Sequence, residues 1–242
     1  MHLHRWIISM VITGVVCLHA IPEAQALTQL REQIIPILGV TMEKKPIGTV
    51  ANVILSFQER DDHNGLAVLF RSGPGRFSRM AQTAVQQAIY RAARAAEMKP
   101  DSWTVVLAVP YSGITIYGDS LSAMISVSVL AMANGESIPA DRVITGAVSP
   151  DGHISPVGSI PLKVAAANEA HLRRVVVPEE IDMADSDWRT PFLMQISPVG
   201  SISEAYLALT DHPLDRGSIR GLQADEKTFE VRHSRGTDDI LK

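Results

Sequence analysis

Apolar residues along the central part of the chain recur with two different periods, one typical of helices and one of buried strands. Residues 80–98 carry apolar side chains at helical spacing and are followed by Pro100, which predicts a helix. Thr104–Pro110 is a short uninterrupted apolar run and predicts a buried strand. The same reasoning predicts helices at 120–133, 162–170 and 203–209, and strands at 143–148, 174–178 and 192–196.

Two further apolar runs, Val50–Gln58 and Leu66–Arg71, flank Asn64-Gly65. Asn-Gly between such runs is the preferred turn of a β-hairpin, so this region predicts one. Because strands and helices alternate, residues 34–210 are expected to form a single α/β or α+β domain. Within it, the heptapeptide ISPVGSI occurs at 154–160 and again at 196–202. Each copy lies between a predicted strand and a predicted helix, and we interpret them as two similar turns.

The N-terminus has the charge and hydropathy order of a secretory signal peptide. Arg5 precedes the uncharged apolar run 6–18, and small residues follow at Ala24 and Ala26. Residues 1–26 are therefore expected to be a cleaved signal, with a periplasmic or secreted product. The alternative is a retained membrane anchor, but 13 apolar residues rise only about 20 Å as a helix against a core of ~30 Å. A lipoprotein anchor at Cys17 is disfavoured because the large Val16 precedes it.

Composition and charge exclude several classes of protein and make some kinds of partner unexpected. The chain of 242 residues is 46% apolar with a net charge of −4, which excludes wholesale disorder and makes nucleic acid an unexpected partner. A single Cys excludes a disulfide framework, and the absence of a GxxxxGK[ST] motif gives no reason to expect a nucleotide. Residues 211–242 hold 13 charges and predict a peripheral, charged C-terminal tail.

Two residues stand out as candidates for chemistry. Ser120 lies at a predicted helix start, where it is either a cap or a nucleophile placed beside free backbone amides. A nucleophilic serine needs a base, either one of the histidines or a neutral lysine. Lys163 lies in the apolar context Leu162–Ala167, where burial would favour its neutral form. The alternative is a lysine whose stem is buried and whose charge reaches solvent.

The stretch 118–180 resembles the proteolytic domain of the Lon protease family, especially its archaeal, membrane-associated branch. The resemblance is carried by motifs in the family's order, and Ser120 and Lys163 stand 43 residues apart, as they do in that family. Weaker similarity covers 34–210. Ser159 replaces the second glycine of a usual pair, Pro161 replaces a polar residue, and Ala147 stands where many members carry an acid. The matching motifs are Gly118-Asp119-Ser120 with Ser122, Val143–Ala147, Asp151-Gly152-His153, Pro156–Ile160, Lys163–Ala166 and Arg174–Glu179.

The resemblance implies a serine endopeptidase with Ser120 as nucleophile and Lys163 as general base. Thr145 would hold the lysine, and the amides around Asp119 and Ser120 would form an oxyanion hole, with Gly118 in the same turn. The implied fold is an α+β domain similar to ribosomal protein S5 domain 2, with mixed sheets and packed helices, over residues 27–210. Polypeptides would be the substrates, with no cofactor and no metal, and a homo-oligomer is compatible with the resemblance. The family's ATPase domain has no counterpart here, so we expect ATP-independent cleavage of flexible or unfolded chains.

Rival functions are also considered. Residues 118–121 spell GDSL, the nucleophile motif of an esterase family, but no histidine follows an aspartate by three residues as that family requires. His153 in its Asp-Gly-His turn is better explained as loop chemistry. No HExxH or similar spacing indicates a metal. The remaining alternative is a catalytically weak, Lon-like peptide-binding module.

Overall fold

The computed structural model describes residues 30–181 and 193–214. The predicted N-terminal signal, most of the predicted C-terminal tail and Phe192 of the last predicted strand lie outside these ranges. In chain order the elements are β1 (Arg31–Val40), β2 (Gly48–Glu59), β3 (Ala67–Phe70), β4 (Arg76–Phe77), α1 (Arg79–Ala95), a 3-10 turn (Pro100–Ser102), β5 (Trp103–Ala108), β6 (Thr115–Ile116), α2 (Ser122–Ala133), β7 (Arg142–Ile144), β8 (Ala147–Val148), β9 (Ile154–Ser155), α3 (Ile160–Glu169), β10 (Arg174–Pro178), β11 (Gln195–Val199) and α4 (Ile202–Thr210).

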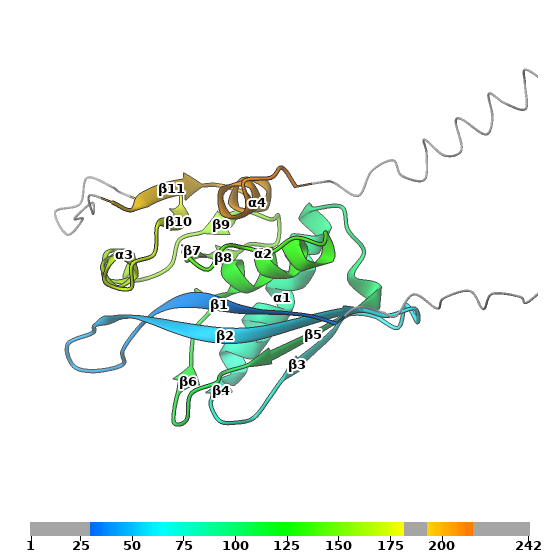
Figure 1. Cartoon of the computed structure of the whole chain (residues 1–242), viewed down its shortest axis with the longest axis horizontal. Coiled ribbons are helices and arrows are strands. Elements are labelled where there is room, and N and C mark those ends of the chain that lie inside the picture. The colour runs from blue at the N-terminus through cyan, green and yellow to red at the C-terminus, as the bar shows by residue number, and fades with distance from the viewer. Residues whose placement is uncertain (1–29, 182–192, 215–242) are drawn as a thin grey trace, which may run out of the picture.

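Two sheets enclose a central helix, which gives the mixed α+β class expected from the sequence. A four-stranded sheet has the order β1-β2-β5-β3, and a parallel sheet has the order β11-β10-β7 (Figure 1). α2 lies between them and is buried from Ser122 to Met132. A helix that is apolar on all sides is stable only inside a core, which explains its place.

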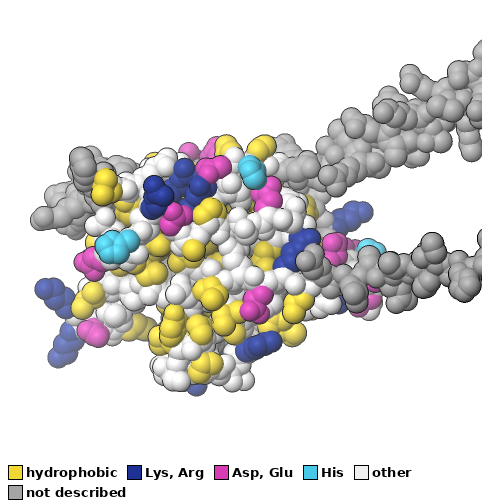
Figure 2. Space-filling view, in the orientation of Figure 1, with side chains coloured by type: hydrophobic (Ala, Val, Ile, Leu, Met, Phe, Trp, Pro, Cys, Tyr) yellow, Lys and Arg dark blue, Asp and Glu magenta, His cyan; other side chains and the backbone are white. Residues whose placement is uncertain are grey.

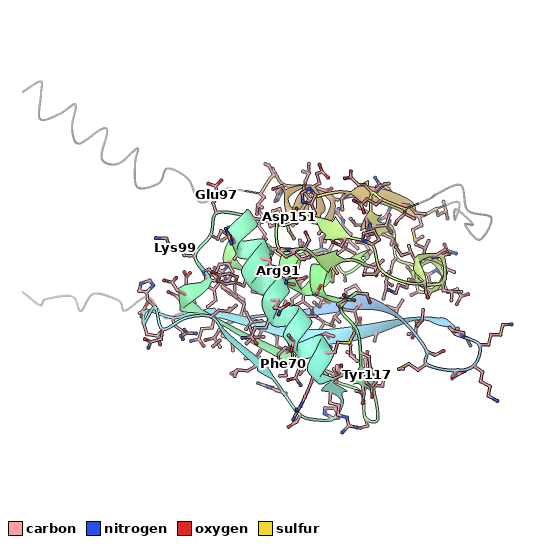
Figure 3. The ribbon with its side chains drawn as sticks, turned by 180° about the vertical axis from the view of Figure 1, so that it is seen from behind. Phe70, Arg91, Glu97, Lys99, Tyr117 and Asp151 are labelled. Atoms are coloured by element: carbon pink, nitrogen blue, oxygen red, sulfur yellow. The ribbon has the colours of Figure 1, made fainter. Side chains whose placement is uncertain are left out.

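α1 packs along α2 with one apolar face, and in Figure 3 it crosses in front of the strands β1 and β2. Its buried residues are spaced by three and four, and the Ser78 hydroxyl caps its first turn by accepting from Ala81 N at 3.2 Å. Arg91 donates from Nη1 to the Val148 carbonyl at 2.7 Å, which ties the helix to β8. The other face of the four-stranded sheet also carries apolar side chains: the strand register places Ile34 and Leu69 on it, and both are more than half exposed. Figure 2 shows hydrophobic side chains gathered over this part of the surface.

The predicted hairpin through Asn64-Gly65 is wrong. β3 pairs in parallel with β5, and β5 lies between β2 and β3. The connecting loop runs around the start of β5 instead of turning back: Arg60 N donates to Ser102 O and Gly65 N to Asp101 O, each at 2.7 Å. These bonds use the amides that a tight turn would need, so β5 takes the place beside β2.

The hairpin of this sheet is formed by β1 and β2, antiparallel around the loop 41–47. The apolar pattern did not predict β1. Pro36 lies within it, and proline argues against a strand unless the strand is at an edge. β1 is an edge strand, the place in a sheet where proline is tolerated.

Other predicted elements are close to those observed. The helices at 80–98, 162–170 and 203–209 and the strands at 104–110 and 174–178 are confirmed. The helix predicted from 120 begins at Ser122, and β11 is shifted to Gln195–Val199. The strand predicted over 143–148 is divided into β7 and β8 by Thr145-Gly146. Both copies of ISPVGSI lie between a strand and a helix, as predicted.

Candidate active site

Ser120 lies in the turn that leads into α2. Gly118 takes a positive φ of 83°, and Ser122 N donates to Asp119 O at 2.8 Å. The N-cap position of α2 is held by Leu121, with no side-chain hydrogen bond. The Ser120 hydroxyl therefore does not cap the helix, although the sequence allowed that interpretation. It lies instead at the wall of a cavity.

Lys163 lies in the first turn of α3 and is buried, with only 3% of the residue exposed. Its Nζ donates to Thr145 Oγ1 at 3.3 Å. Burial lowers the pKa of Lys163 from 10.5 to about 8, and the negative charge of Asp119 opposes that shift. The amine does not reach solvent as a surface lysine would, and an appreciable fraction of it is neutral at mildly alkaline pH.

One cavity of about 830 Å³ brings the two candidates together. Ser120 and Lys163, far apart in sequence, both line it. Its long walls are residues 37–42 at the end of β1 and residues 113–118 before the serine. Tyr117, which lies beyond the N-terminal end of α1 in Figure 3, and Met42 are exposed at its rim. Sequence reasoning missed these walls because they carry no motif. The alternating Ile114 and Ile116 were the only local signal.

The dipeptide Thr145-Gly146, where the predicted strand is interrupted, contacts both candidates. The Thr145 hydroxyl accepts from Lys163, and Gly146 N donates to the Ser120 carbonyl at 3.1 Å. Thr145 N is itself bonded to Val176 O of β10 at 3.1 Å. A Cβ at Gly146 would lie 2.7 Å from Ile154 Cγ2, so the close packing here requires glycine. Two consecutive residues, Thr145 and Gly146, thus link the serine turn, the lysine and the parallel sheet.

The backbone around the serine offers donors to a ligand. Within the described ranges, the amides of Asp119 and Ser120 donate to no other backbone carbonyl. They lie at the entry to a helix, where the backbone dipoles favour negative charge. The turn can therefore stabilise an oxygen that becomes negative beside the Ser120 hydroxyl.

The histidines considered as bases lie elsewhere. His63 Nδ1 is 2.7 Å from Ser102 Oγ and 3.5 Å from an Asp101 oxygen, so both partners meet the same ring nitrogen and cannot form a relay. His153 pairs with Asp151 at 2.9 Å on the surface, as expected of a loop. No described histidine lines the Ser120 cavity, and His233 lies outside the described residues.

The described ranges, 30–181 and 193–214, hold no candidate for a metal cluster or for a membrane-spanning helix. In this part of the chain no group of three or more His, Cys, Asp or Glu side chains is placed to hold a metal ion. No helix there combines the length and the apolar character needed to cross a bilayer.

Ser120 and Lys163 thus line one cavity, and comparison with known proteins gives the family. Residues 77–206 match the model of the Lon protease (S16) C-terminal proteolytic domain, which is more than half of the chain. The chain therefore belongs to the Lon proteolytic-domain family, a family of serine peptidases.

Individual relatives agree with this assignment. The chain is 29% identical over 123 residues to an archaeal Lon protease of Archaeoglobus fulgidus, covering 50% of this chain and 19% of the relative. It is 42% identical over 71 residues to an archaeal Lon protease of Thermoplasma acidophilum, covering 28% and 10%. It is 32% identical over 85 residues to the peroxisomal Lon protease homolog 2 of Caenorhabditis elegans, covering 34% and 11%. The matched region is thus a fifth or less of the length of each of these relatives.

Proposed function

We propose that this protein is a serine endopeptidase in which Ser120 is the nucleophile and Lys163 the general base. The observation that carries the proposal is that both residues line one cavity, with the Lys163 amine buried and its pKa lowered to about 8. A lysine can accept a proton only when it is neutral, and burial makes the neutral form accessible.

In the proposed reaction the neutral Lys163 Nζ takes the proton of Ser120 Oγ as that oxygen attacks the scissile carbonyl carbon. The carbonyl oxygen becomes negative and is stabilised by the amides of Asp119 and Ser120. Lys163 then returns the proton to the leaving amine as the C–N bond breaks, which leaves an acyl-enzyme. A water molecule, deprotonated by the same amine, hydrolyses this ester and restores Ser120.

Three further residues support the dyad in this proposal. Thr145 orients the amine through its hydroxyl, at 3.3 Å from Nζ. The charge of Asp119 stabilises the protonated lysine that forms during attack. Gly118 supplies the positive φ that turns the chain into the serine, a conformation that costs other residues about 1–2 kcal/mol.

We further propose that the domain has the fold of ribosomal protein S5 domain 2, and that it cuts flexible or unfolded polypeptides without ATP. The exposed Met42 and Tyr117 at the cavity rim suit an extended chain with apolar side chains. The signal-like residues 1–26 support export to the periplasm or beyond. N-terminal sequencing of the protein recovered from that compartment tests export, with a new terminus expected at Leu27.

The decisive experiment is cleavage of casein, and of a quenched fluorescent peptide, by the purified protein without nucleotide. Ser120→Ala and Lys163→Ala should each lower the rate by roughly 10³-fold or more, because each removes a member of one catalytic unit. Ser122→Ala, two residues further on and buried in α2, is the matched serine control. Lys99→Ala, which removes an exposed lysine, is the corresponding control for Lys163→Ala.

The outcomes separate the rival functions. Equal cleavage by wild type and both variants would contradict the dyad. Peptide binding without cleavage by the wild type would favour the Lon-like binding module. Faster hydrolysis of short-chain esters than of peptides would favour the GDSL-type esterase.

A further inference from the structure

Gly48, the first residue of β2, lies directly against the first turn of α3. A Cβ added at this position would lie 1.9 Å from the Leu162 carbonyl oxygen and 2.7 Å from its carbon. It would also lie 3.0 Å from Ala166 Cβ, one turn further along α3. Strand and helix backbones thus touch at a point where any side chain would separate them.

The backbone conformation at this position does not require glycine. Gly48 is paired with Val40 in the antiparallel register of β1 and β2, and its φ lies outside the positive range where glycine is favoured. Glycine weakens a strand because it costs more entropy than alanine to order. Lack of space alone therefore explains why residue 48 is glycine: the carbonyl group of Leu162 occupies the place that a side chain would need.

Leu162 immediately precedes Lys163, so the contact between Gly48 and the Leu162 carbonyl fixes the position of the Lys163 backbone. From there the side chain extends to Thr145 Oγ1 and to the cavity shared with Ser120. Because Thr145 is held in place separately, the distance between α3 and β2 decides whether Lys163 Nζ keeps its hydrogen bond to the Thr145 hydroxyl.

We propose that Gly48 is a positioning residue for catalysis: the absence of a side chain there seats α3 on β2 and so places Lys163 beside Thr145, in the cavity that it shares with Ser120. This inference rests on the proposed function of the dyad. An alanine at 48 would have to displace the Leu162 carbonyl by roughly 1 Å or more to reach normal contact distance. Misplacement by 1 Å of a group in a catalytic site costs about 100-fold in rate.

The test compares Gly48→Ala with Gly158→Ala in the full chain. Gly158 lies just before α3, and a Cβ there would meet nothing within 4 Å. Gly48→Ala should lower kcat about 100-fold with a much smaller change in KM, because the amine and not the substrate contact is displaced. Gly158→Ala should leave both constants near those of the wild type.

A second readout does not depend on catalysis. In protein labelled at lysine Cε with ¹³C, the Lys163 resonance is assigned by its loss in Lys163→Ala, and its pKa is measured by titration. Lifting α3 from β2 admits water, so Gly48→Ala should raise the pKa of Lys163 from about 8 towards 10.5, while Gly158→Ala should not. This result holds even if the wild type cuts no peptide, which separates the inference from the proposed function.

Ala166→Val enlarges the same contact from the helix side and carries the test if Gly48→Ala fails to fold. It should move kcat and the pKa of Lys163 in the same directions. Unchanged values of both in a folded Gly48→Ala or Ala166→Val protein would overturn the proposal, as would an equal change in Gly158→Ala.

Discussion

Burial of a charged lysine amine lowers the stability of the fold. A lysine buried in the core therefore points to a function that needs the neutral amine. Lys163 is held in the core by a single neutral partner, the Thr145 hydroxyl, and Asp119 supplies the nearby negative charge. Burial outweighs that charge, so the pKa is lowered rather than raised. Below this pKa the folded protein carries an ammonium with few partners, which is unfavourable for stability but suits a base.

The first prediction at this scale concerns pH. In the proposed mechanism only the neutral amine accepts the Ser120 proton, so kcat/KM should rise about tenfold per pH unit below pH 8 and level off above it. A pH profile with a fluorescent peptide measures this. Asp119→Asn removes the charge that opposes the shift, so its midpoint should move to lower pH. A profile centred near pH 6.5, typical of histidine, would contradict Lys163 as the base.

At the scale of single residues, the sequence was informative where a residue type is unusual among its immediate neighbours. A lysine among apolar residues is a visible conflict: 162–167 left open a buried amine or a charge that reaches solvent, and the structure shows Lys163 buried. The cavity walls could not be predicted in this way. Residues 37–42 and 113–118 meet only because β1, β2 and the serine turn pack together, and nothing in either segment specifies the other.

The two copies of ISPVGSI show how an element's surroundings decide its conformation. Ser201 is an extended N-cap whose hydroxyl accepts from Glu204 N at 3.3 Å, while the Glu204 carboxylate accepts from Gly200 N at 2.7 Å. Ser159 has φ of 59° and no side-chain cap. The difference lies beyond the repeat: Ser201 is followed by Glu204, a capping-box pattern, whereas Ser159 is followed by Pro161.

These identical serines should therefore respond in opposite ways to mutation. Ser159→Gly should raise the free energy of unfolding by about 1 kcal/mol, because it removes the cost of a left-handed conformation. Ser201→Ala should lower it by about 1 kcal/mol through loss of the cap. Urea unfolding of both variants measures the two effects. Changes of the same sign would show that the two turns are equivalent after all.

Strand pairing marks the limit of prediction at the element scale. Helix α1 and strand β10 follow from patterns within their own sequence and were placed almost correctly. The hairpin failed because pairing depends on distant residues: the Arg60 guanidinium donates to Trp103 O at 2.8 Å and holds the loop against β5. Asn64-Gly65 allows a turn but does not decide which strand comes next.

Across the whole molecule, the C-terminal end of α4 is fastened to both arginine-bearing strands of the parallel sheet. Arg142 of β7 donates to Leu209 O, and Arg174 of β10 to Ala208 O, at 2.9 and 2.6 Å. Both also pair with Asp211, the C-cap of the helix. Asp211 was expected to begin a peripheral tail, and these contacts instead join it to the domain.

This fastening predicts an acid-sensitive contribution to stability. The hydrogen bonds from Arg142 and Arg174 lower the pKa of Asp211 from 3.8 to about 2. A lowered acid pKa stabilises the fold above pH 4, and that contribution is lost as pH falls towards 2. Asp211→Asn should lower Tm at pH 6, and its difference from the wild type should shrink as pH approaches 2.

Asparagine is the matched replacement because it tolerates the left-handed backbone of this residue, φ 63°. The variant therefore removes charge without adding strain. Thermal unfolding followed by circular dichroism from pH 2 to 7 measures the effect. A Tm difference that does not change with pH would show that the carboxylate charge is not what holds α4.

The link through Thr145-Gly146 has a mechanical consequence. Two groups attached to separate parts of a structure drift relative to each other whenever those parts shift. Here the serine turn and the lysine amine are both hydrogen-bonded to Thr145-Gly146, which is itself hydrogen-bonded to β10. A movement of the parallel sheet would therefore carry the serine turn and the lysine amine together, and would change the distance between them less than a movement of two independently held groups.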